Sequence, residues 1–228
     1  RNEKGKLVDQ TEAAGLSEVL GWWTGINAAD VDNDGDLDYL ATNFGLNTKY
    51  KASPKAPEIL FYGDFEGTGR NRIVEAGFED GVCYPHRGFS CSRNAMPFVG
   101  QKLKSFHAFA KSTLPEIYPT NKLENSLQLQ ANTLATGIFF NDGKARFTFR
   151  PLPGLAQASP SFGSTIFDAT GDGNPDLFLA QNFFGPQIET RPMNNGLGVL
   201  LAGDGKGAFA PLWPAQSGIL IPEDAKSV

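Results

Sequence analysis

One pattern constrains the fold of this chain more than any other: an acidic, glycine-containing loop between two short apolar strands. It occurs in full at residues 30–38 (DVDNDGDLD) and in part at residues 168–176 and 64–72. Each copy has an apolar segment before the loop and another after it, which is typical of a β-hairpin. Three such copies in one chain indicate a repeat architecture.

A second hairpin alternates with the acidic one. Residues 137–149 and 198–209 each have two apolar runs separated by Asp142-Gly143 or Asp204-Gly205, and Asp-Gly between apolar runs is a strong hairpin signal. An acidic-loop hairpin followed by an Asp-Gly hairpin makes four strands per unit, the pattern of a propeller blade.

The sequence therefore predicts an all-β fold built from β-propeller blades over residues 1–228, with about three blades in part or whole. Residues 6–11 look like the last strand of a further unit, and residues 217–222 look like the lead-in to another. A closed propeller has about four to eight blades. We therefore expect the remaining blades to come from a longer native chain or from another subunit.

The loop at residues 30–38 suits a calcium ion. Calcium prefers six to eight hard oxygen ligands, and glycine at the sixth loop position permits the sharp turn that directs alternate side chains inward. Carboxylates so close together would repel one another without a cation. The predicted ligands are Asp30, Asp32, Asp34 and Asp38, with Asp36 contributing its backbone carbonyl. The loop lacks the glutamate at position 12 of an EF-hand and is flanked by strands, so it is not an EF-hand.

The two partial copies lead to different expectations. Residues 168–176 keep three carboxylates and replace one with a neutral oxygen, so we expect a second, weaker calcium site there; its predicted ligands are Asp168, Thr170, Asp172, Asn174 and Asp176. At residues 64–72 the ninth position is Arg72. A guanidinium cannot bind a metal and can instead pair with carboxylates, so no calcium is expected in that loop.

One stretch interrupts the repeats. Residues 79–132 form a predicted insertion, and residues 97–124 have apolar side chains near helical spacing. Cys83 and Cys91 lie in this insertion. They either form a short disulfide loop or remain free thiols, and they lack the spacing of a zinc or thioredoxin motif.

Composition excludes some classes of partner. The net charge of −5 and the pI near 5.1 disfavour a nucleic-acid-binding protein, which usually carries a basic face. No run of about 18 apolar residues is present, so no membrane-spanning helix is expected. The chain begins at Arg1 without an initiator methionine, which suggests a processed protein or an excised piece of a longer one.

The acidic loops and the strands that follow them resemble the FG-GAP and VCBS repeats, the calcium-loop propeller blades also found in integrin α-subunit heads. The family loop is D-x-D-x-D-G-x-x-D, and residues 43–45 and 182–185 match the Phe-Gly segment that follows it. The segment from Gly21 through Pro54 looks most like large exported bacterial repeat proteins of the ASPIC/UnbV-associated type. The resemblance implies an exported or cell-surface protein whose calcium stiffens the blade loops, with roles in adhesion, protein docking or glycan contact.

Three functions follow as hypotheses. The first is a calcium-stabilised binding or scaffold module that contacts a protein or glycan. The second is a lectin-like propeller whose exposed aromatic rings stack on sugars, although such rings more often pack in the core; the candidates are Trp22, Trp23, Tyr39 and Trp213.

The third hypothesis is a propeller enzyme acting on polysaccharide. Neither His86 nor His107 lies in a metalloprotease pattern, and no G-x-S-x-G motif is present. We therefore expect no enzyme activity, and no catalytic role for His86, which has no carboxylate partner nearby in the sequence. Tyr84, His86 and Arg87 are candidates for a partner contact, against the alternative of an ordinary ordered loop.

Overall fold

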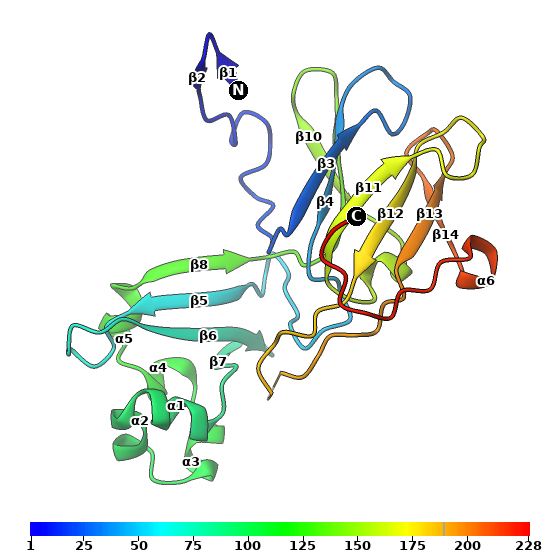
Figure 1. The fold of residues 1–228 in the computed structure, drawn as a ribbon. Helices are drawn as coiled ribbons and strands as arrows, with labels where there is room; N and C mark the ends of the chain where they lie inside the picture. The colour runs from blue at the N-terminus through cyan, green and yellow to red at the C-terminus, as the bar shows by residue number, and fades with distance from the viewer. Residues whose placement is uncertain (189) are drawn as a thin grey trace. The chain divides into compact units, whose positions relative to one another are not determined.

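The computed structural model describes residues 1–188 and 190–228, which divide into two compact units. Unit 1 comprises residues 1–49 and 134–228, and unit 2 comprises residues 50–133. Unit 2 therefore lies in sequence between the second and third strands of a sheet that belongs to unit 1 (Figure 1). Among the described residues, no helix has the length and apolar character needed to cross a bilayer.

Unit 1 contains a short N-terminal hairpin and two four-stranded antiparallel sheets. Sheet I has the order β10-β9-β4-β3 and sheet II has the order β11-β12-β13-β14, so each is a simple meander when unit 2 is left out. The strands and short helices of this unit are β1 (Asn2–Glu3), β2 (Lys6–Leu7), β3 (Gly25–Ala29), β4 (Asp38–Thr42), β9 (Gly137–Asn141), β10 (Phe147–Pro151), η1 (Gly154–Gln157), β11 (Ser161–Phe167), β12 (Asp176–Gln181), β13 (Val199–Gly203), β14 (Phe209–Leu212) and α6 (Pro214–Ser217).

The turns of both sheets follow from their sequences. Gly143 and Gly205 have φ angles of +76° and +65° in the two Asp-Gly hairpins, a left-handed conformation that glycine adopts without the steric cost of a Cβ atom. The preceding Asp142 and Asp204 each accept two backbone N–H hydrogen bonds from the turn that follows, at 2.8 to 3.2 Å. The side chain and the glycine together fix the hairpin register.

Sheets I and II share one apolar core. Leu40 and Ile138 of sheet I pack in a single buried cluster with Leu177, Leu179 and Leu201 of sheet II. At the first strands, the Asn27 amide donates to the backbone oxygen and to the hydroxyl of Ser164, at 2.7 Å each. The sheets thus pack face to face, and the first strand of one lies beside the first strand of the other.

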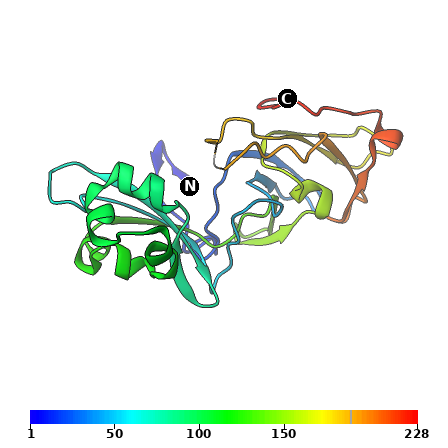
Figure 2. The ribbon, with the colours of Figure 1, turned by 90° about the horizontal axis from the view of Figure 1, so that it is seen from below.

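Unit 2 is a mixed layer of strands and helices. Its strands are β5 (Glu58–Gly63), β6 (Arg72–Glu79), β7 (Val82–Pro85) and β8 (Leu127–Ala131), and its helices are α1 (Phe89–Ala95), α2 (Pro97–Lys102), α3 (Phe106–Lys111), α4 (Leu114–Ile117) and α5 (Thr120–Glu124). The helices lie on one face of the sheet (Figure 2). Phe61, Val74 and Ala76 of the sheet join the core formed with helix residues such as Ile117 and Val99.

The all-β prediction is confirmed at the level of class, because strands in antiparallel sheets dominate the chain. The prediction of about three similar blades needs correction, since only two sheets share the meander order. In unit 2 the order is β7-β6-β5-β8, so the fourth strand pairs with the first strand and not with the third. Sheets I and II do not close into a ring.

The helical segment is longer than the predicted range 97–124, because α1 already begins at Phe89. It consists of five short helices and not of one continuous element. Pro97 and Pro115 stand in the first turns of α2 and α4, positions where proline is tolerated because the N–H there has no helical partner. Cys83 and Cys91 are separate thiols in this structure, not linked to each other.

Packing between sheets I and II should dominate the stability of unit 1. Leu179 on β12 is fully buried in the shared core, so Leu179→Ala should lower the free energy of unfolding by about 2–5 kcal/mol through lost burial and a cavity. Urea unfolding followed by circular dichroism measures this. Leu220→Ala, at a leucine that is 65% exposed, is the control and should change stability by less than about 0.5 kcal/mol. Equal effects of the two variants would contradict the shared core.

Candidate metal centre

The acidic loop at residues 30–38 connects β3 to β4 and is organised by its first carboxylate. The two oxygens of Asp30 accept hydrogen bonds from the backbone N–H groups of Asp34, at 3.1 Å, and Gly35, at 2.9 Å. Gly35 has a φ of +95°, which reverses the chain at the loop tip. The loop therefore curls around its own first residue.

The last carboxylate of the loop, Asp38, is buried and joins the loop to the next hairpin. Its side chain is 1% exposed. Oδ2 accepts the N–H of Val31 at 3.2 Å, and Oδ1 accepts the N–H of Asn141 at 2.8 Å. Asn141 ends β9, so one carboxylate connects the start of the acidic loop with the third strand of sheet I.

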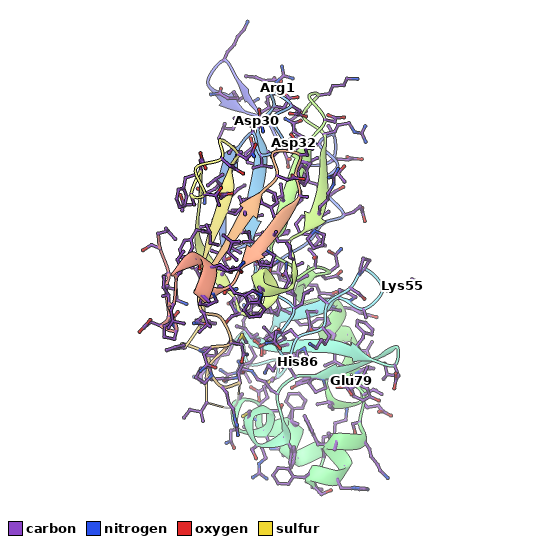
Figure 3. All side chains as sticks on the ribbon, turned by 90° about the vertical axis from the view of Figure 1, so that its right-hand side faces the viewer. Arg1, Asp30, Asp32, Lys55, Glu79 and His86 are labelled. Atoms are coloured by element: carbon purple, nitrogen blue, oxygen red, sulfur yellow. The ribbon has the colours of Figure 1, made fainter. Side chains whose placement is uncertain are left out.

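Three carboxylates converge at this loop. Asp30, Asp32 and Asp38 each have an oxygen within 4.8 Å of the other two, and they form the one such group of three acidic, histidine or cysteine side chains in the described chain. Asp30 and Asp32 lie at the end of unit 1 where the loops gather (Figure 3). The Oδ1 atom of Asp32 is buried and has no hydrogen-bond partner in the described structure.

Electrostatics agree with this geometry. Burial raises the pKa of the Asp32 carboxyl, and the nearby charges of Asp34 and Asp30 raise it further. Burial also raises the pKa of Asp38, although the N–H groups of Asn141 and Val31 counteract part of that shift. Neighbouring carboxylates with raised pKa values are costly to ionise together, and a bound cation would stabilise their charged forms. Hard oxygens in a curled loop with glycine at its sixth position are the donors that calcium prefers.

The other two predicted ligands of this loop lie outside the triad. An Asp34 oxygen accepts the N–H of Asp36 at 3.0 Å. The Asp36 carboxylate lies against the neighbouring Asp-Gly hairpin, where a Cβ atom added to Gly143 would come within 2.6 Å of Oδ2. The structure therefore brings together three of the four carboxylates predicted as ligands in this loop, and the predicted backbone carbonyl of Asp36 stays a prediction.

The second loop, residues 168–176, repeats the scaffold. Asp168 accepts the N–H groups of Gly171 at 2.7 Å and Gly173 at 3.0 Å, and Asp172 accepts that of Asn174 at 2.9 Å. Asp176 is fully buried and accepts three N–H groups at 2.8 to 2.9 Å, from Ala169, Thr170 and Gly203. The backbone satisfies this carboxylate more fully than it satisfies Asp38, and the five predicted ligands form no convergent acidic triad in the described residues.

The third loop, residues 64–72, has the same first residue and a different last one. Asp64 accepts four backbone N–H groups at 2.7 to 3.2 Å, and these hydrogen bonds, led by that of Gly69, lower the pKa of its carboxyl. Arg72 at the ninth position lies 3.8 Å from Glu66, measured from Nε to Oε2. The guanidinium thus pairs with the Glu66 carboxylate, while backbone N–H groups satisfy Asp64.

A polar pair in unit 2 was missed by sequence reasoning. The His86 ring is hydrogen-bonded through Nε2 to Glu58 Oε2, so the expectation that His86 lacks a carboxylate partner is wrong. Glu58 is 4% exposed and also accepts the N–H of Lys51 at 2.9 Å. Glu58 begins β5 and His86 directly follows β7, so the partners are 28 residues apart and no local pattern in the sequence links them.

The aromatic residues considered for sugar stacking divide into packed and exposed groups. The Trp22 ring meets Phe44 edge-to-face at 5.1 Å, and the Trp23 ring meets Phe139 at 5.4 Å, between ring centroids. Tyr39 packs against Phe147 at 5.3 Å. Trp213 is 60% exposed and stands apart from these pairs at the start of α6, so the four rings form no single platform.

Comparison of the chain with protein-family models, with curated proteins and with solved structures found no match. The resemblance to FG-GAP and VCBS repeats therefore stays a hypothesis based on the loop motif. The geometry of the loops is the observation from which function can be argued.

The buried Glu58 should depend on its histidine partner. His86→Ala should destabilise unit 2 by about 1–3 kcal/mol, because a buried carboxylate would lose one of its hydrogen bonds. His107→Ala, at the exposed histidine on α3, is the matched control and should have little effect. Thermal unfolding at pH 7 measures both variants. Equal melting temperatures for His86→Ala and the parent protein would show that the pair contributes nothing.

The raised pKa values of Asp32 and Asp38 predict how the stability of the metal-free protein changes with pH. A carboxyl whose pKa is higher in the folded than in the unfolded chain stabilises the fold at low pH, and this contribution is lost as pH rises through the folded pKa. With a chelator present to remove metal, the contribution of Asp32 to the melting temperature should therefore fall as the pH rises above 3.8, the ordinary pKa of an aspartate side chain. Asp32→Asn removes the ionisable group. The melting temperature of the variant should therefore rise relative to that of the parent protein as the pH increases. A difference that does not change with pH would contradict the raised pKa.

Proposed function

We propose that this chain is a calcium-stabilised β-sheet module that serves as a binding or scaffold element of an exported protein. The observation that carries the proposal is the triad of Asp30, Asp32 and Asp38, with a buried Asp32 oxygen that no protein group satisfies. Burying an unpaired carboxylate oxygen is costly unless a cation or a donor compensates. A hard divalent cation bound by the three carboxylates would supply that compensation.

The location of the triad supports a structural role for the ion. Asp38 is hydrogen-bonded to the end of β9, and the neighbouring Asn33 amide donates to the backbone oxygen of Gly205 in sheet II, at 3.2 Å. The same end of unit 1 carries the β3–β4, β9–β10 and β11–β12 loops (Figure 1). An ion in the first loop would therefore stiffen a loop cluster contributed by both sheets.

The irregular arrangement of oxygen ligands in this loop favours calcium over magnesium. Calcium accepts irregular sets of carboxylate and carbonyl oxygens, whereas magnesium demands near-ideal octahedral geometry and keeps its waters. Loops of this kind with three converging carboxylates suit the weak affinities of extracellular modules, about 10⁻⁴–10⁻³ M. Export to a calcium-rich compartment is accordingly part of the proposal.

A binding or scaffold role is favoured over catalysis by the chemistry of the side chains in unit 1. Its convergent carboxylates are the proposed ion ligands, and both histidines of the chain belong to unit 2. We therefore assign the stiffened loops to contact with a protein or glycan partner.

Calcium should raise the melting temperature of the intact chain relative to EDTA. A ligand that binds only the folded state adds about 2.7 kcal/mol of stability at a hundredfold excess over its dissociation constant. Asp32→Asn should abolish most of the shift. Asp142→Asn, at an exposed carboxylate of the β9–β10 hairpin, should retain it.

Titration calorimetry with calcium chloride then gives the stoichiometry, expected as one ion for the first loop and, more weakly, one for the second. Absence of both a thermal shift and binding heat in millimolar calcium would overturn the proposed metal centre. If calcium still raises the melting temperature of Asp32→Asn by the same amount, the ion binds at a site other than this triad.

A further inference from the structure

One arginine breaks the apolar pattern that sheets I and II share. Leu40 and Phe178 each stand two residues after the last aspartate of their acidic loops, so their positions are equivalent. Pairing across the third and fourth strands leads from Leu40 to Arg150 on β10, and from Phe178 to Leu212 on β14. Leu212 packs against the buried apolar cluster of its sheet. Sheet I therefore has an arginine where sheet II has a packed leucine, and packing alone does not require the charge.

Arg150 is stacked on a buried aromatic ring. Its guanidinium carbon lies 4.3 Å from the centroid of the Phe140 ring, which is within the range of a cation–π contact. The Phe140 ring also lies against Gly207 of the β13–β14 hairpin, where an added Cβ atom would come within 2.7 Å of it. Stacking uses the flat face of the guanidinium and leaves the N–H donors along its edge free to bind an acceptor.

The stacked guanidinium stands at the wall of a small cavity between sheet I and the β13–β14 hairpin. The cavity has a volume of about 260 Å³, and its walls include Leu152, Pro153 and Phe209. Arg150 is the one charged side chain that lines it in the described structure, and the other lining side chains are apolar or glycine. Arg150 is exposed and forms no ion pair with an acidic side chain of the described residues.

These features define the chemistry of a ligand. A guanidinium edge binds a carboxylate through two parallel hydrogen bonds, a geometry that arginine offers and lysine does not. Pockets for drug-sized ligands have volumes of about 300–1,000 Å³, so a cavity of about 260 Å³ has room for a smaller molecule with one ring. No lining side chain except Arg150 can hydrogen-bond a hydroxyl group, so the walls favour an apolar ring over a sugar.

We propose that this cavity binds a small apolar carboxylate, such as an aromatic acid with a single ring. The carboxylate pairs with the edge of the Arg150 guanidinium, and the ring lies in the cavity against Leu152 and Phe209. None of the lining residues belongs to an acidic loop, so the site is separate from the metal centre and does not require calcium. A bound acid would contact sheet I and the β13–β14 hairpin of sheet II together.

Saturation-transfer NMR on the 228-residue chain, with phenylacetate as the probe, tests the site. Phenylacetate should bind saturably, and equally well in EDTA and in millimolar calcium. Phenylacetamide has the same shape without the charge, and acetate has the charge without the ring. Each of the two should bind at least about tenfold more weakly, because each lacks one of the two contacts. No binding of phenylacetate, or equal binding of the acid and the amide, would overturn the proposal.

Substitutions of Arg150 test the pairing. Arg150→Leu introduces the residue type found at the equivalent position of sheet II, so it should keep the circular dichroism spectrum of the parent while binding phenylacetate at least about tenfold more weakly. Arg150→Lys keeps the charge without the planar fork and should also bind more weakly than the parent. Arg146→Leu, at an exposed arginine of the β9–β10 turn outside the cavity, is the matched control and should bind as the parent does.

Two outcomes of these substitutions would overturn the site. In one, Arg150→Leu binds phenylacetate as tightly as the parent. In the other, Arg146→Leu loses as much affinity as Arg150→Leu. The calcium-induced melting shift, measured on the same samples, separates this site from the metal centre: a shift without phenylacetate binding overturns only the cavity, and phenylacetate binding without a shift overturns only the metal centre.

Discussion

The buried carboxylate at the ninth position of each acidic loop is the interaction on which unit 1 depends. Asp38 and Asp176 are almost completely removed from solvent, and each accepts backbone N–H groups from its own loop and from the third strand of its sheet. A hydrogen bond to a charged acceptor is stronger than a neutral one, and breaking it would leave a buried charge unpaired. The acidic hairpin and the next hairpin are thereby held in one register in both sheets.

The third acidic loop shows what happens without that carboxylate. Arg72 occupies the ninth position and pairs with Glu66 on its own loop, so nothing equivalent extends from the loop to a third strand. In that sheet the fourth strand, β8, pairs with the first strand and not with the third. The first carboxylate, Asp64, still closes its loop by capping backbone N–H groups. Loop closure is thus local to the motif, whereas the place of β8 is decided elsewhere, because the third strand, β7, still pairs with the second strand, β6, without the ninth-position carboxylate.

This division explains how much of the structure the sequence could predict. The acidic loops and Asp-Gly turns are local, because each is specified by side chains within a few residues of the backbone they bind, and both were placed correctly. The position of β8 and the pairing of His86 with Glu58 depend on segments 28 or more residues apart. For the metal centre, the spacing selected four carboxylates, but Asp34 accepts a backbone N–H of its own loop and lies outside the group, which leaves the carboxylates of Asp30, Asp32 and Asp38 near one another. The residue spacing of the loop motif does not predict which of its carboxylates converge.

The alternation of side chains along the strands has a further consequence for this repeat. A sheet with one polar face can stand against solvent, but sheets I and II are apolar on both faces: Leu40 and Phe139 lie on opposite sides of sheet I, and Leu177 and Phe178 on opposite sides of sheet II. Such a sheet is stable only between two neighbours. Sheets I and II bury one face of each against the other, and Ile219, Ile221 and Ala225 of the C-terminal segment cover the face of sheet II that carries Phe178. The face of sheet I that carries Phe139 lies opposite Leu16, Val19 and Leu20, which line the groove beside Ile26. Segments outside the sheets therefore supply the second neighbour that the apolar strand pattern requires.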